Sequence, residues 1–240
     1  MMLWASLALA SASSDFEAAN KLLAEGDLPG AEAAYTQIVA SGVHDADVYF
    51  NLGNVLFRQD RRVDAVLAWR RAQLLAPRDA DIAANLDFVR RDFVDGIAPA
   101  APVPAWAPWQ SALTSDEGEW VGASLAAAGL LLFAFRKRVP AGPAAGIGLF
   151  ATCAGLIVGA AGVAEAALPP AAVVRPASIT VRSDLGSGVD LFVLHAGAEV
   201  LTQATAGDFV LIALPDGRKG WVPRSAMGLI QLDAPFPAQG

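Results

Sequence analysis

Apolar residues recur at three- and four-residue spacing between residues 15 and 95, with polar residues at the positions between them. This pattern is typical of helices that bury one face. Turn-forming residues interrupt it at 26–30, at Ser41 and Gly42, and at Pro77. We therefore expect an all-α domain of short helices over residues 13–95.

Two long apolar stretches follow, at residues 118–135 and 141–164, and neither shows a polar face. A helix needs about 20 apolar residues to cross a bilayer core, so both stretches are predicted to be transmembrane helices. Only residues 136–140 separate them, and so short a connection makes the two helices antiparallel. The alternative is a helical hairpin buried in the core of a soluble domain.

The charges around these stretches predict their orientation. Arg136, Lys137 and Arg138 lie in the short loop, and cytoplasmic loops are rich in Lys and Arg. Residues 136–140 are therefore predicted to be a basic cytoplasmic loop. The predicted location is the inner (cytoplasmic) membrane of a bacterium, with two transmembrane helices and both terminal domains periplasmic.

The first 12 residues form a short apolar run that ends in Ala-x-Ala spacings. Such a run resembles a cleavable secretory signal peptide, and export agrees with the predicted orientation. No Lys or Arg precedes the run, so the alternative is a frayed apolar N-terminus or a start codon assigned too late.

The remaining segments differ in pattern from these helices. Prolines at four positions between residues 96 and 110 predict a stiff, extended linker over 96–117. From residue 172 to 232 the pattern changes to alternation of apolar and polar residues, in five or six short runs separated by turn residues. This predicts a small all-β barrel, followed by a disordered tail over 233–240.

The composition restricts the classes of partner and of reaction that we expect for this chain. The formal net charge is -7 and no basic patch stands out, which argues against nucleic acid as a partner. One cysteine, Cys153, and two histidines, His44 and His195, leave too few ligands for the common metal sites. No catalytic or phosphate-loop motif is present, so we expect neither an enzyme nor a cofactor.

The most specific local signal is a set of residue types spaced as in a ~34-residue repeat. Small residues would let two antiparallel helices cross, an aromatic ring would fill the space beside them, and a proline would end the second helix. These repeat-packing residues are Tyr49, Leu52, Gly53, Ala65, Trp69, Ala72 and Pro77. They resemble the tetratricopeptide repeat, and shifted partial matches predict two repeats plus a charged capping helix. A generic helical bundle is the alternative.

The resemblance implies a concave groove lined by the first helix of each repeat. The candidate groove residues are Phe16, Asn20, Phe50, Asn51, Asn54, Phe57, Arg58 and Asn85. Family members that clamp a peptide C-terminus combine asparagines at the positions of Asn20 and Asn51 with nearby cations, but Phe16 and Asp81 stand where those cations would be. A groove that hydrogen-bonds an extended backbone fits better. The alternative for the phenylalanines is packing between repeats.

The predicted strands include segments that resemble a bacterial SH3-like domain. The residues that make up this resemblance are Val181, Arg182, Ser183, Gly197, Gly217, Gly220 and Trp221. The proline that usually follows the first segment and the tryptophan often seen near Phe209 are absent. Such domains bind peptides or cell-wall glycan, or act as spacers. Trp221 is either a half-buried structural residue or a ligand platform.

The order of these parts resembles BatE-type proteins of bacterial Bat (aerotolerance) operons. The expected fold is a multidomain membrane protein: all-α tetratricopeptide repeats, a two-helix transmembrane hairpin and a small all-β SH3-like barrel. The resemblance implies a non-catalytic, membrane-anchored adaptor in an envelope stress complex, with von Willebrand factor A-type proteins of the same operon among its membrane or periplasmic partners. The alternative is a tether or sensor that binds peptidoglycan through the SH3-like domain.

Overall fold

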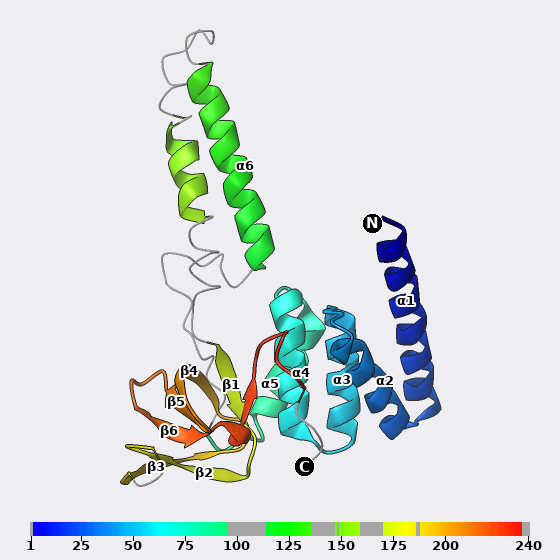
Figure 1. Cartoon of the computed structure of the whole chain (residues 1–240), viewed down its shortest axis with the longest axis vertical. Helices are drawn as coiled ribbons and strands as arrows, with labels where there is room; N and C mark the ends of the chain where they lie inside the picture. The colour runs from blue at the N-terminus through cyan, green and yellow to red at the C-terminus, as the bar shows by residue number, and fades with distance from the viewer. Residues whose placement is uncertain are drawn as a thin grey trace. The chain divides into compact units, whose positions relative to one another are not determined.

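The computed structural model describes residues 2–95, 114–135, 147, 149–158, 170–185 and 188–236. The chain divides into two compact units. The first combines residues Met1–Pro102 with Pro169–Gly240, and the second is Val103–Leu168. The first unit contains a helical array and a β module, which are coloured blue to cyan and yellow to red in Figure 1.

The helical array consists of consecutive antiparallel helices joined by short turns. These are α1 (Met2–Glu25), α2 (Leu28–Ala40), α3 (Ala46–Arg58), α4 (Arg62–Leu75) and α5 (Ala80–Arg90) (Figure 1). Asp27, Asp45 and Asp79 precede α2, α3 and α5, and each carboxylate accepts a hydrogen bond from an amide of the first turn. Such caps satisfy amides that have no partner within the helix. Residues 2–12, which were expected to be a signal peptide, belong to α1.

The β module is an antiparallel sheet that follows the helices in the chain. Its strands are β1 (Ala171–Val174), β2 (Ser178–Arg182), β3 (Asp190–His195), β4 (Glu199–Ala206), β5 (Phe209–Ala213), β6 (Lys219–Pro223) and β7 (Met227–Leu229). The hydrogen-bonded order is β3-β2-β6-β5-β4-β1-β7. This order does not close on itself, so the predicted small barrel of five or six strands is corrected to a seven-stranded sheet with β3 and β7 at its edges.

The β module and the helical array share apolar contacts. Val173 of β1 and Ile230, just after β7, belong to the same buried cluster as the helices. A Cβ added to Gly228 would lie 2.9 Å from Leu67 of α4, so this edge of the sheet lies close against that helix. The C-terminal segment, residues 230–236, continues along the array, and Phe236 packs against its core. Residues 233–236 were expected to be part of a disordered tail.

The second unit contains α6 (Ser115–Ala134) and a further helical stretch that includes residues 149–158. Thr114 and Glu117 form a reciprocal capping box at the start of α6. A Cβ added to Gly155 would lie 2.4 Å from the backbone nitrogen of Ala126, so the two helices touch backbone to backbone there. Large apolar side chains of α6 remain exposed, including Trp120 at 75%.

The prediction of a transmembrane hairpin is wrong. Within the described ranges, no helix combines the length and the apolar character needed to cross a bilayer. The reason lies in the bounds of α6: its first turns include Glu117 and Glu119, and the uncharged part from Trp120 to Ala134 is roughly 22 Å long at about 1.5 Å per residue. A bilayer core is about 30 Å thick.

The predicted location in an inner membrane, with two spans and periplasmic terminal domains, is corrected by the same finding. The basic loop that set the orientation, with Arg136, Lys137 and Arg138, lies outside the described residues. So do residues 96–113 of the predicted linker and most positions of 141–164 beyond the helical stretch. The fold is therefore a helical array with a β-sheet, and a helical second unit.

Candidate functional site

A three-residue hydrogen-bonded unit occurs twice in the helical array. Asn20 Oδ1 of α1 accepts hydrogen bonds from the Tyr35 hydroxyl (2.5 Å) and from Asn51 Nδ2 (3.0 Å). One repeat later, Asn54 Oδ1 of α3 accepts from Trp69 Nε1 (3.3 Å) and Asn85 Nδ2 (3.1 Å).

Each member of the second unit lies 34 residues after its counterpart in the first. The two units therefore show the repeat in the side-chain contacts as well as in the sequence. They tie α1 to α3 and α3 to α5, the first helices of successive repeats. Burial raises the pKa of the Tyr35 hydroxyl, which keeps that group protonated as a donor at ordinary pH.

The hydrogen bonds also orient the amides of the two accepting asparagines. The Oδ1 atoms of Asn20 and Asn54 accept hydrogen bonds from the next repeat, so their Nδ2 groups point away from these bonds. Both side chains are half-buried. Among the described residues, no acceptor for either Nδ2 group is found. Two amide donors, one repeat apart, are thus available on the first helices.

Aromatic rings accompany these amides. The Phe57 ring lies 5.7 Å from Trp69 and 6.0 Å from Phe88, measured between centroids, and it meets Phe88 edge-on at 75°. Phe16 contacts Tyr35 at 6.1 Å. Phe16, Phe50 and Phe57 are half-buried and pack against the core. Packing and ligand contact are both compatible with these positions.

Phe88 of α5 was missed by the sequence analysis. Its side chain is 58% exposed although its ring contacts Phe57. It lies 34 residues after Asn54, so the repeat spacing was the signal that could have placed it on the same face. An exposed aromatic ring beside a half-buried one is a typical contact residue for a partner.

The ends of α3 carry opposite charges. Asp47 lies in its first turn and Arg58 in its last turn, and both side chains are exposed. Asp81 is likewise exposed in the first turn of α5. The face that contains Asn54 and Phe57 is therefore acidic at the helix N-termini and basic at the end of α3.

The predicted repeat-packing residues fill the array. Those that are buried are Tyr49, Leu52, Gly53, Ala65, Trp69 and Ala72. A Cβ added to Gly53 would lie 2.4 Å from Trp69 Nε1, so only glycine leaves room for the indole. Pro77 follows the end of α4 at Leu75.

Charged side chains gather where the array meets the β module. We call Asp64, Arg70, Arg71, Arg90, Arg175 and Glu199 the charged seam. Arg70 Nη2 lies 2.7 Å from Glu199 Oε2, and Arg90 Nη2 lies 4.0 Å from Oε1. The Glu199 side chain is completely buried. Burial raises the pKa of its carboxyl, against the opposing effect of Arg70 and Arg90.

Arg71 is a completely buried cation of the seam. Its Nη2 group donates to the carbonyl oxygens of Leu229 (3.0 Å) and Pro235 (3.4 Å). Its guanidinium also lies over the rings of Phe236 (5.3 Å) and Tyr49 (6.0 Å). Burial lowers the pKa of Arg71. Arg71 thereby holds the C-terminal segment against α3 and α4.

Both histidines of the chain pair with aspartates that are distant in the sequence. His195 Nδ1 lies 3.1 Å from Asp95 Oδ1, and its backbone N–H donates to Asp95 Oδ2 (2.5 Å). His44 Nε2 lies 3.4 Å from Asp233 Oδ1 in the C-terminal segment. Neither histidine is part of a cluster of three or more metal-ligating side chains within the described ranges.

The predicted motif residues of the β module have mostly structural contacts. Val181 is buried, Arg182 pairs with Asp190 at 3.1 Å, and Ser183 Oγ accepts from the Val189 amide at 2.9 Å. Trp221 is half-buried and lies opposite Leu211 and Arg182 in the sheet.

The three motif glycines shape the turns and the sheet. Gly197 has φ +86°, and a Cβ there would lie 2.5 Å from Phe93 at the end of the array. Gly220 lies under Val181, and Gly217 belongs to the turn between β5 and β6. These contacts favour a structural role for the motif.

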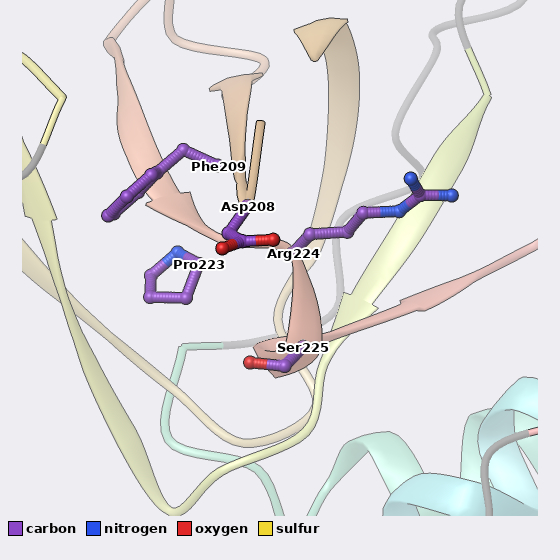
Figure 2. Close-up of a pocket in the computed structure, with 5 residues that line it drawn as sticks. All are labelled: Asp208, Phe209, Pro223, Arg224 and Ser225. Atoms are coloured by element: carbon purple, nitrogen blue, oxygen red, sulfur yellow. The ribbon is translucent and has the colours of Figure 1, made fainter. Parts of the chain in front are cut away.

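A shallow hollow lies on the β module away from these residues (Figure 2). Asp208, Phe209, Pro223, Arg224 and Ser225 line it. The Arg224 amide donates to the Asp208 carbonyl at 2.7 Å, which holds the two loops together. In Figure 2 the Phe209 ring, Pro223 and the Asp208 carboxylate lie near one another, whereas the Arg224 side chain extends away from them.

No protein-family model matches this chain, and no curated protein matches it.

Proposed function

We propose that the protein is a non-catalytic adaptor that binds an extended segment of a partner protein on the first helices of its tetratricopeptide-like repeats, α1, α3 and α5. The observation that supports this best is the repeated unit of Asn20 and Asn54. It directs two half-buried amide donors, one repeat apart, beside a row of aromatic rings.

The spacing suits an extended backbone. Packed helices lie about 8–10 Å apart, and an extended chain rises about 3.3 Å per residue. The two amides would therefore meet carbonyl groups about three residues apart in the bound segment. Phe57 and the exposed Phe88 would contact its apolar side chains.

The charges favour an internal segment over a free C-terminus. Asp47 and Asp81 are exposed at one end of the face, and they would repel a carboxylate placed there. The preferred ligand has a basic residue toward Asp47 and Asp81, and apolar residues toward Phe57 and Phe88.

Selection of random 12-residue peptides displayed on phage against the full chain tests this proposal. We expect enrichment of sequences with apolar residues and a basic residue near one end. Phe88→Glu should abolish binding of the enriched peptides. The matched control is Leu74→Glu on α4, where a leucine that is 49% exposed is replaced by the same residue. Absence of enrichment, or equal losses in both variants, contradicts the proposal.

The resemblance to BatE-type proteins gives one class of partner, a von Willebrand factor A-type protein of the same operon. Its support is the order of helical repeats followed by a β module. Co-expression and co-purification with such a protein, lost on Phe88→Glu and retained on Leu74→Glu, is the expected result.

A second candidate function is binding of cell-wall glycan by the β module. The hollow of Figure 2 favours it, because Phe209 offers a ring for a sugar face while the Asp208 carboxylate beside it offers hydrogen-bond acceptors. Co-sedimentation of the full chain with purified peptidoglycan tests it. Binding that is lost in Phe209→Ala and retained in Phe88→Glu would support glycan binding, and no co-sedimentation would exclude it.

A further inference from the structure

The C-terminal segment, residues 230–236, is attached to the helical array much as a bound peptide would be. The Ile230 amide donates to β1 (2.8 Å), and within the described part of the chain it is the last amide bonded to a strand. Beyond it, the Tyr49 hydroxyl donates to the Leu232 carbonyl (3.4 Å). The side chain of Asp233 is fully exposed. Side chains of the array, and not strand pairing, therefore hold this end of the segment.

Arg71 makes further polar contacts with this end of the chain, through Nη2 and the carbonyls of Leu229 and Pro235. Its Nε and Nη1 atoms are buried and have no hydrogen-bond partner among the described residues. Burial lowers the pKa of Arg71, and no carboxylate in the described ranges offsets that effect. A buried charge is costly unless it is paired and hydrogen-bonded. The present occupant thus satisfies this cation only in part.

Phe236 lies where a better partner for the cation would be. Its ring centre is 5.3 Å from the Arg71 guanidinium carbon. A ring attracts a cation, but it gives the N–H groups of the guanidinium no strong acceptor. A glutamate side chain reaches about as far as this ring, and its two oxygens match the fork of an arginine. A carboxylate at this position would therefore accept from donors that phenylalanine leaves unbonded.

The surface beside the segment also accommodates an acidic side chain. His44 Nε2 lies 3.4 Å from Asp233 Oδ1, and the imidazole Nδ1 lies 3.2 Å from the Tyr49 hydroxyl. Asp233 and Phe236 are three positions apart in the sequence. The contacts of this site thus favour a ligand with two carboxylates at that spacing, one near His44 and one near Arg71.

We propose that Tyr49 and Arg71 form a binding site for an acidic segment of a partner protein, and that residues 230–236 occupy this site as a weaker substitute. The partner places a glutamate or aspartate where Phe236 lies, and its backbone carbonyls accept from Tyr49 and Arg71. The chain's own segment competes with the partner, so the apparent affinity is reduced by the fraction of chains that have released it. None of these residues belongs to the groove proposed above, so the two proposals can be tested separately.

Fluorescence anisotropy with two labelled peptides tests the proposal. The first is residues 230–236, Ile-Gln-Leu-Asp-Ala-Pro-Phe, and the second has glutamate in place of the final phenylalanine. Both carry an amidated C-terminus. The receptor is the full chain with Phe236→Ala, which weakens the competing segment. We expect the glutamate peptide to bind it about tenfold or more tightly than the phenylalanine peptide, because charge-assisted hydrogen bonds replace the ring contact. It should bind the wild type more weakly than this variant.

Arg71→Lys in the Phe236→Ala chain keeps the charge but removes the fork, and it should weaken binding of the glutamate peptide about tenfold. Arg62→Lys is the matched control, because Arg62 lies on the same helix with a side chain that is 45% exposed, and it should leave binding unchanged. Tyr49→Phe removes only the hydroxyl that bonds Leu232. It should weaken binding of both peptides, and it decides the test if Arg71→Lys does not fold.

Hydrogen exchange of the wild type gives an independent readout. The glutamate peptide in excess should accelerate exchange in residues 231–236, because it displaces that segment from the array. Three results overturn the proposal: no binding of either peptide to the Phe236→Ala chain, equal binding of the two peptides, or binding that persists in Tyr49→Phe and Arg71→Lys. Peptide binding that leaves exchange in residues 231–236 unchanged overturns it as well.

Discussion

At the scale of single residues, four asparagines show how far sequence reasoning reaches. Asn20, Asn51, Asn54 and Asn85 were selected as groove residues from their repeat positions. In the structure their amides bond one another across repeats. Which amide meets which depends on how far neighbouring helices are offset, and spacing within one repeat does not contain that information. The residues could be predicted, but not their hydrogen bonds.

Asn54→Ala should destabilise the array. The change removes the acceptor of Asn85 Nδ2 and one acceptor of Trp69 Nε1, while the indole keeps the Phe50 carbonyl. Loss of one partner at a part-buried site costs about 1–2 kcal/mol in the free energy of unfolding, measurable by urea unfolding. Gln37→Ala, at an exposed position of α2, should change it by less than about 0.5 kcal/mol. If the two variants change the free energy of unfolding equally, the hydrogen-bonded unit contributes nothing to it.

Glu199 predicts a particular dependence of stability on pH. Because burial raises the pKa of its carboxyl in the folded state, the ionised form is less favourable there than in the unfolded chain. Its contribution to the free energy of unfolding should fall as pH rises from the ordinary glutamate pKa, about 4.3, to the raised value. Below that window the penalty is absent, and above it the penalty is constant.

The measurement is urea unfolding of the wild type and of Glu199→Gln at several pH values. The wild type should lose stability relative to the glutamine variant as pH rises through the window. Glu25→Gln, at a residue whose side chain is 56% exposed and pairs with Lys21, should show no such trend. A wild-type advantage that grows with pH would mean that the arginines outweigh burial.

At the scale of elements, the alternation of apolar and polar residues and the position of turn residues predicted most strands but not all of them. Six of the observed strands, β1 to β6, overlap runs that the alternation of apolar and polar residues predicts. β7, Met227–Leu229, was missed because three residues are too few to show a period, and its pairing with β1 joins distant parts of the chain.

The error over α6 has the opposite origin. An apolar stretch was read as long enough to span a bilayer, whereas the capping box at Thr114 and Glu117 places its first turns in charged sequence.

The contact between α3 and α4 depends on one small residue. Gly53→Ala places a Cβ 2.4 Å from Trp69 Nε1, and the buried indole has little room to move. Overpacking of this kind costs about 1–3 kcal/mol, seen as a lower midpoint of thermal unfolding. Gly118→Ala in α6 makes the same change where nothing lies within 4 Å. It should leave the midpoint unchanged or raise it, since alanine favours helix over glycine by roughly 0.5–1 kcal/mol.

At the scale of the whole molecule, the sequence suggested separate modules where the structure has one unit. Arg70 meets Glu199 and Arg71 meets Leu229 across intervals of 129 and 158 residues. The segment between them includes the entire second unit. Such pairs cannot be read from local pattern, because each charged residue alone is equally suited to a solvated helix face. The consequence is that array and β module should unfold together.

Arg71 is the residue on which that coupling depends most. Arg71→Ala removes the hydrogen bonds to Leu229 and Pro235, empties a fully buried site, and releases the ring of Phe236. We expect a loss of about 2–5 kcal/mol, with faster hydrogen exchange in β7 and residues 230–236. Arg62→Ala changes the same residue type on the same helix, but its side chain is 45% exposed and pairs with Asp60 and Asp92 at the surface. Its cost should stay within about 1 kcal/mol. If the helical circular-dichroism signal and the hydrogen-exchange protection of the β strands are lost at different denaturant concentrations in the wild type, the modules are independent and the charged seam does not couple them.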